Sequence, residues 1–162
     1  MKKNSTLYLT RGAIIATIYV TLTLFSALFG LDKGVIQLRL SESLCILPVF
    51  FSEAVPGLFI GCLIANLVTG ATALDVIFGS IATLLGAIGA RLLRNLPEKL
   101  IFITTLPTVM ANVIIVPLLL KYAYALDGAL WFFALTVGIG EIATATIIGT
   151  ILYGVLKKSG KF

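Results

Sequence analysis

Five acidic or amide side chains interrupt stretches that are otherwise apolar: Glu42, Asn66, Asp75, Asn112 and Glu141. Carboxylates accept hydrogen bonds and pair with cations, whereas amides donate as well as accept. An ionised carboxylate at the centre of a lipid bilayer costs at least about 2.5–3.5 kcal/mol, so it needs a partner or a water-filled cavity. If these stretches cross a membrane, the five side chains could together bind a small polar ligand or relay a cation.

The composition predicts that these stretches do lie in a membrane. Of the 162 residues, 59% are hydrophobic and 12% are charged, whereas soluble domains carry about 25% charged residues. The net charge of +5 would suit nucleic acid, but nucleic-acid binders gather basic residues on one polar face. Here nine of the twelve Lys and Arg residues form three clusters separated by apolar stretches, at positions 2–11, 91–99 and 157–161. We expect a single domain, residues 1–162, embedded in the lipid bilayer and binding no nucleic acid.

The apolar stretches predict an all-α integral membrane protein. Helices satisfy every backbone polar group internally, as the hydrocarbon region requires. Six helices are expected, at 12–31, 41–51, 56–68, 75–93, 100–120 and 128–156, with Pro107 kinking the fifth. The first stretch has the length of a full span rather than that of a signal peptide, and the second and third are shorter than a standard span. An extended segment is expected over 35–40, with Gln37 and Arg39 on one side.

The basic residues predict the orientation of this six-helix bundle. Six crossings place nine Lys and Arg residues on the side of the termini and three on the other: Lys33, Arg39 and Lys121. The positive-inside rule then places both termini in the cytoplasm. At 1.5 Å of rise per residue, Glu141 lies about 20 Å below the outer surface, near the middle of the bilayer. The other four polar side chains fall in the outer half, so we expect an outward-facing pocket.

Each polar side chain also has a structural interpretation. Asp75 could cap its helix, and the two asparagines could hold neighbouring helices together. Glu42 could pair with Arg39, three residues earlier. Glu141 is the hardest to explain in this way. Trp131 could stack on a flat ligand, although aromatic rings at its depth more often form an interfacial belt.

Several classes of chemistry lack their sequence signatures. The chain has no His, no G-x-x-x-x-G-K-[ST] loop and no candidate catalytic triad. Cys45 and Cys62 lie in apolar stretches, where a lone cysteine most often packs as a small hydrophobe. We therefore expect a protein that is not an enzyme and holds no metal or cofactor. Energy for uphill transport would come from a partner protein or an ion gradient.

Three segments resemble the QueT family: IQLRLSESL at 36–44 with LPVF at 47–50, PGLFIGCLIANL at 56–67, and DVIFGSIATL at 75–84. The pair Gly140-Glu141 fits as well. The resemblance implies a six-helix substrate-binding (S) component of an energy-coupling factor (ECF) transporter in a bacterial plasma membrane. It implies three partners, a transmembrane coupling protein and two cytoplasmic ATPases. S components often dock the coupling protein through an Ala-x-x-x-Ala face on the first helix; this chain departs from that pattern, and its nearest equivalent is Gly12, Ala13 and Ala16.

The resemblance also implies the ligand, a queuosine precursor of the 7-deazaguanine type such as 7-aminomethyl-7-deazaguanine. One carboxylate can accept the N1–H and 2-amino donors of a guanine edge, a second can pair with the aminomethyl ammonium, and asparagine amides can donate to the 6-oxo group. Glu141 or Glu42 is expected on the guanine edge and Asp75 on the ammonium. The expected substrate-binding set is Arg39, Glu42, Asn66, Asp75, Asn112, Trp131 and Glu141. Three alternatives stay open: an S component for another small vitamin, an ion-coupled carrier or channel with Glu141 as relay, and a structural membrane subunit.

Overall fold

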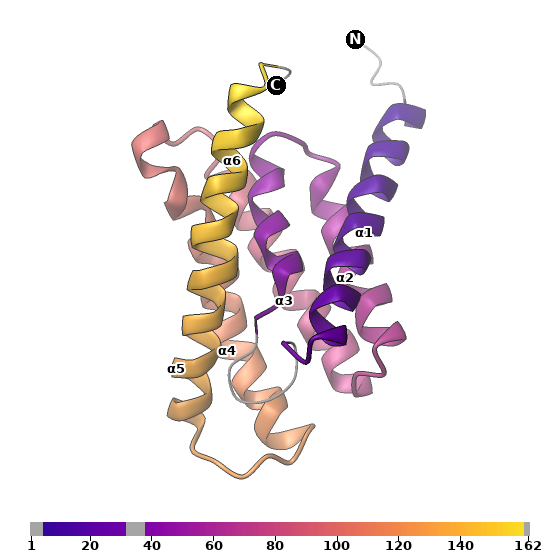
Figure 1. The fold of residues 1–162 in the computed structure, drawn as a ribbon, viewed down its shortest axis with the longest axis vertical. Coiled ribbons are helices and arrows are strands. Elements are labelled where there is room, and N and C mark those ends of the chain that lie inside the picture. Colours follow the sequence, from indigo (N-terminus) through magenta and orange to yellow (C-terminus); the bar gives the residue numbers. More distant parts are fainter. Residues whose placement is uncertain (1–4, 32–37, 161–162) are drawn as a thin grey trace.

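The computed structural model describes residues 5–31 and 38–160, and the regular structure in these ranges is helical (Figure 1). The elements in chain order are α1 Ser5–Leu28, η1 Leu40–Val49, α2 Ala54–Val68, α3 Ala73–Leu92, η2 Glu98–Thr105, α4 Leu106–Tyr122, α5 Leu130–Glu141, η3 Ile142–Ile148 and α6 Gly149–Lys158. η1 and η2 are 3₁₀ helices, and η3 is a π-helical stretch. The first half of the expected extended segment, residues 35–37 including Gln37, lies outside the described ranges. Arg39 does have an extended backbone, with φ −87° and ψ 101°.

Among the described residues, four helical stretches are long and apolar enough to cross a bilayer: Ser5–Leu28, Ala73–Leu92, Glu98–Tyr122 and Leu130–Lys158. The other two apolar helices, η1 and α2, have ten and fifteen residues, fewer than the roughly 20 that a standard α-helical span needs. The prediction of an all-helical protein with long apolar spans is confirmed. The shortness expected of the second and third helices is also found.

The short helix η1 lies in the middle of the bundle. It packs against α1, α3, α6 and η3, and all its residues from Ser41 to Pro48 are buried. Backbone that departs from the α-helix is tolerated at membrane depth when protein surrounds it. The longer helices therefore isolate η1 and its polar side chains from lipid.

Glycines bring α1 and α2 into close contact. A Cβ atom on Gly57 would lie 2.7 Å from the carbonyl oxygen of Gly12, and one on Gly61 would lie 3.0 Å from that of Ala16. Only glycine allows backbones to approach so closely. Gly12 and Ala16 therefore lie in the internal α1–α2 contact, whereas Ala13, the third residue expected to dock a partner, is exposed.

A kink is expected at Pro107. The proline lies in the first turn of α4, directly after the 3₁₀ helix η2, within one continuous helical stretch from Glu98 to Tyr122. The residues before it form η2, so the fifth span changes from 3₁₀ to α geometry at this point.

α1 begins and α6 ends at the same end of the bundle (Figure 1). Basic side chains connect the elements at this end. Arg11 forms an ion pair with Glu53, which lies in the turn before α2, at 3.3 Å, and Lys157 pairs with Glu98 at 2.5 Å. Arg91 donates to a carbonyl oxygen near the end of η1 at 2.9 Å. Arg91 and Lys157 lie in the last turns of their helices.

Candidate functional site

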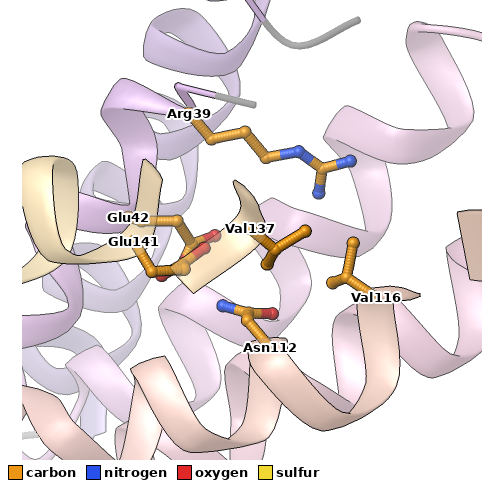
Figure 2. Close-up of a pocket in the computed structure, with 6 residues that line it drawn as sticks. All are labelled: Arg39, Glu42, Asn112, Val116, Val137 and Glu141. Carbon is orange, nitrogen blue, oxygen red and sulfur yellow. The ribbon is translucent and has the colours of Figure 1, made fainter. Parts of the chain in front are cut away.

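A small buried cavity lies among η1, α4 and α5. Six described residues line it: Arg39, Glu42, Asn112, Val116, Val137 and Glu141. Figure 2 shows the Glu42 and Glu141 side chains extending in the same direction into the pocket, with the Asn112 amide nearby and the Arg39 side chain extending past them. The cavity volume is about 10 Å³, roughly the room that one water molecule needs.

The 3₁₀ geometry of η1 accounts for the position of Glu42. Residues three apart eclipse one another in a 3₁₀ helix, so Glu42 and Cys45 project from the same side of η1. Cys45 packs against Val109 of α4 and Ala145 of η3. This side of η1 therefore faces α4 and the last span, from which the other polar side chains come.

Helical spacing places the remaining lining residues. Asn112 and Val116 are four residues apart on α4, and so are Val137 and Glu141 on α5; side chains at this spacing share a helix face. Glu141 is the last residue of α5, immediately before the π-helical η3. π segments inside α-helices often occur at functional sites.

Four of the lining residues have a buried polar atom without a hydrogen-bond partner among the described residues: Arg39 Nε, Glu42 Oε2, Asn112 Nδ2 and Glu141 Oε2. Glu42 is 2% exposed and Glu141 is 7% exposed. Buried polar atoms are nearly always paired in folded proteins, so four around one cavity are unusual. Two are acceptors and two are donors, and a ligand carrying both kinds of group could satisfy all four.

Arg39 links the cavity to a second polar cluster. Its Nη2 atom lies 3.6 Å from Asp75 Oδ2, and the Tyr124 hydroxyl donates to the same oxygen at 2.6 Å. The alternative pairing of Arg39 with Glu42 is not the one found. Burial, followed by the hydrogen bond to Asp75 and the charge of that carboxylate, raises the pKa of Tyr124. The cluster ties the starts of η1 and α3 to the loop before α5.

Asp75 is not the cap of α3. The N-cap residue is Thr72, whose hydroxyl accepts from the Asp75 N–H at 3.3 Å. The Asp75 side chain is thereby free to turn toward Arg39 and Tyr124. It lies outside the lining of the cavity and contacts the site through Arg39.

Two of the expected site residues lie elsewhere. Asn66 donates to the backbone oxygen of Asp75 at 3.3 Å and lies 3.6 Å from Cys62 Sγ, so it bonds α2 to α3. Trp131 is 71% exposed at the start of α5. Neither residue lines the cavity.

The model of the family described as QueT transporter matches residues 9–158. The chain belongs to the QueT transporter family. It is also similar to the queuosine precursor transporter QueT of Lactococcus lactis subsp. cremoris (strain MG1363), with 38% identity over 84 residues. These residues make up 52% of this chain and 49% of the relative, so the match spans about half of each. No solved structure matches the chain.

The family assignment confirms the resemblance inferred from the sequence, and it places this QueT family member among transporters. Among the described residues, no group of three or more His, Cys, Asp or Glu side chains is arranged to hold a metal ion.

Sequence reasoning missed two tyrosines of this QueT family member. Tyr19, on α1, donates to Glu42 Oε1 at 2.5 Å, and Tyr124 bonds Asp75. A buried tyrosine hydroxyl usually has a hydrogen-bond partner, so Tyr19 within an apolar span was the available signal. No pattern in the sequence marks Val116 and Val137 as lining residues, because apolar side chains surround them on their helices.

Proposed function

We propose that this chain is the S component of an ECF transporter and captures a queuosine precursor from outside the cell for ATP-driven uptake. The proposed ligand is a 7-deazaguanine such as 7-aminomethyl-7-deazaguanine. Membership of the QueT transporter family supports transport, and the name of the Lactococcus relative supports this ligand class. The observation that carries the proposal is the group of four unpartnered polar atoms around one buried cavity.

The ligand offers complementary groups. A guanine edge presents N1–H and a 2-amino group as donors and a 6-oxo group as acceptor, and the aminomethyl group adds an ammonium. In the proposed complex, the free oxygens of Glu42 and Glu141 accept from these donors, and the Asn112 amide and Arg39 Nε donate to the 6-oxo group. Charge-assisted hydrogen bonds of this kind are roughly twice as strong as neutral ones.

The balance of charge favours a cationic ligand. Three carboxylates, those of Glu42, Asp75 and Glu141, surround one guanidinium, that of Arg39. Buried charges without partners are costly, and an ammonium brought by the ligand would reduce this excess. Since Asp75 already pairs with Arg39, we assign it the role of orienting Arg39, and the ammonium goes to one of the two glutamates.

Binding requires the cavity to open. A cavity of about 10 Å³ does not hold a bicyclic base, so Val116, Val137 and the Arg39 side chain must move apart. Arg39, its partner Asp75, and Tyr124, which donates to Asp75, come from three different segments at the proposed outer end. We propose that their separation admits the ligand.

The positions of the basic residues support cytoplasmic termini. Arg11, Arg91, Arg94, Lys99 and Lys157 lie near the end where α1 begins and α6 ends, which the positive-inside rule assigns to the cytoplasm. The proposed partners are a transmembrane coupling protein and two cytoplasmic ATPases. The exposed face of α1 that carries Ala13 is the proposed docking face, because Gly12 and Ala16 are engaged with α2.

Calorimetry on detergent-purified protein tests the ligand. We expect tight binding of 7-aminomethyl-7-deazaguanine and weaker binding of 7-cyano-7-deazaguanine, which lacks the ammonium. A folded protein that binds no 7-deazaguanine contradicts the assignment, and a thermal-shift panel of small vitamins then tests the alternative S-component ligands.

Reconstitution tests the transport class. Liposomes that contain the protein alone should not sustain concentrative uptake, whereas those that also contain the coupling protein and ATPases should do so on addition of ATP. Proton or cation flux through the protein alone would instead favour an ion-coupled carrier or channel with Glu141 as its relay.

A further inference from the structure

Tyr19 connects α1 to the proposed substrate site. Its side chain is 1% exposed, and its hydroxyl donates to Glu42 Oε1 at 2.5 Å. The other carboxylate oxygen, Oε2, has no partner among the described residues. The two oxygens of Glu42 therefore have different surroundings: one is bonded to a neighbouring helix, and the other is left for the cavity.

The close contact between α1 and α2 holds Tyr19 in place. A Cβ atom on Gly61 would lie 2.9 Å from the Cβ of Tyr19, a distance that forces one of the two helices to shift. The glycine therefore lets the Tyr19 side chain run between α2 and η1 toward Glu42. A fully buried side chain in such a contact has few alternative rotamers, because protein interiors are close-packed.

We propose that Tyr19 is a positioning residue of the substrate site. It occupies one oxygen of Glu42 and stops the carboxylate from rotating, so that Oε2 presents a fixed acceptor to the ligand. This inference rests on the proposed function, because the cavity must be the ligand site. It implies that Glu42 receives a single ligand donor through Oε2, rather than two donors through both oxygens.

The neighbouring contacts between α1 and η1 provide a control. One turn further along α1, Thr23 Oγ1 donates to Ser41 Oγ at 2.9 Å, and the backbone N–H of Leu40 donates to Ser26 Oγ at 3.1 Å. These bonds also hold the first turn of η1, but they do not involve Glu42. Thr23→Val removes one of them, together with the contact between the Thr23 hydroxyl and the Tyr19 carbonyl oxygen at 3.0 Å, and reports the effect of loosening α1 against η1 while the Tyr19 hydroxyl and Glu42 are unchanged.

A double-mutant cycle on ligand affinity tests the proposal. Calorimetry with 7-aminomethyl-7-deazaguanine is run on the wild type, Tyr19→Phe, Glu42→Ala and the double variant. We expect Tyr19→Phe to weaken binding roughly three- to tenfold in the wild-type background, because the ligand must then order a carboxylate that Tyr19 otherwise holds. The loss should be less than about twofold when Glu42 is absent. Thr23→Val should weaken binding by less than Tyr19→Phe does. If Tyr19→Phe weakens binding equally in both backgrounds, or if Thr23→Val has the same effect, Tyr19 has a structural role only.

Thermal unfolding of the same four proteins without ligand separates this proposal from the proposed function. If the wild type binds no 7-deazaguanine, the ligand assignment fails, but the two substitutions should still lower the unfolding midpoint non-additively. Additive changes mean that Tyr19 does not fix Glu42, and they overturn the inference.

If Tyr19→Phe does not fold, a comparison of two glycine variants on α2 tests the same proposal. Gly57→Ala and Gly61→Ala both crowd the α1–α2 contact, but only the second pushes against Tyr19. We expect Gly61→Ala to lose more ligand affinity than Gly57→Ala and to lower the midpoint non-additively with Glu42→Ala. If the two glycine variants lose equal affinity, or if the changes in midpoint are additive, the inference is overturned.

Discussion

Replacing Glu141 with glutamine keeps the shape of the side chain and removes its charge. Glu141 is 7% exposed, and its Oε2 atom has no partner among the described residues, so the proposed ligand supplies the missing hydrogen bond. A hydrogen bond to a charged group contributes about 1.5–3 kcal/mol. Since about 1.4 kcal/mol corresponds to a factor of ten, we expect Glu141→Gln to weaken binding of 7-aminomethyl-7-deazaguanine by roughly 10- to 100-fold.

Without ligand, the stability of Glu141→Gln should not fall, although its ligand affinity does. An unpaired buried charge destabilises the folded state, so Glu141→Gln should leave the thermal unfolding midpoint unchanged or raise it. A variant that binds less tightly without unfolding more easily has lost a ligand contact, not its fold. Calorimetry and a thermal melt of the same preparation measure both quantities.

Glu53→Gln is the matched control. Glu53 is also a buried carboxylate, but it pairs with Arg11 in the turn before α2, away from the cavity. Distant sites act independently to within about 0.5 kcal/mol, so Glu53→Gln should change ligand affinity by no more than about twofold. If both Glu141→Gln and Glu42→Gln bind with wild-type affinity, the assignment of this cavity as the ligand site is wrong.

Three further predictions concern other parts of the fold. Gly86→Ala would place a methyl group 2.4 Å from a hydroxyl oxygen of α4, so it should destabilise the protein by about 1–3 kcal/mol. Gly154→Ala should not, because among the described residues no atom beyond its own stretch of helix lies within 4 Å of the added methyl group; thermal melts compare the two variants. Burial and Asp75 raise the pKa of Tyr124. In an ultraviolet titration, Tyr124→Phe should therefore lack one phenol that in the wild type ionises above the usual pH of tyrosine. An alkaline titration curve identical to that of the wild type would contradict this. Burial alone would raise the pKa of Glu53, but hydrogen bonds from its own backbone N–H and from the Arg11 guanidinium outweigh burial, so the pKa is lowered. The stability that the ionised carboxylate contributes is therefore present above its unfolded pKa. This stability is lost as the pH falls through its folded pKa. The unfolding midpoint of Glu53→Gln should consequently depend less on acidic pH than that of the wild type.

The sequence predicts the apolar spans and the convergence of Glu42, Asn112 and Glu141, because membrane insertion penalises polar side chains wherever they occur. It does not predict which side of a helix faces the interior. α4 is apolar apart from Thr108, Asn112 and its last two residues, so no amphipathic pattern sets its rotation. For this reason Asn66 and Asn112 were equivalent in the sequence, yet one bonds α2 to α3 and the other lines the cavity.

Contacts between segments distant in the chain could not be predicted from the sequence either. Arg39 has Glu42 three residues away, but its extended backbone and the approach of α3 bring Asp75 to its guanidinium instead. Helix ends differ from the apolar stretches for a related reason. Hydropathy marks the part of a helix that suits lipid, whereas α1 begins at Ser5, seven residues before the apolar stretch.

The 3₁₀ winding of η1 determines how far this short helix extends through the bundle. A 3₁₀ helix rises about 2.0 Å per residue and an α-helix about 1.5 Å, so the ten residues of η1 extend roughly 20 Å instead of 15 Å. This reach lets one short segment begin beside Arg39 and finish at the carbonyl oxygen that accepts from Arg91, near the opposite end of the bundle. If η1 relaxed into an α-helix, it would shorten by about one α-helical turn and rotate Glu42 away from Cys45. Its winding therefore sets both the depth and the direction of the carboxylate.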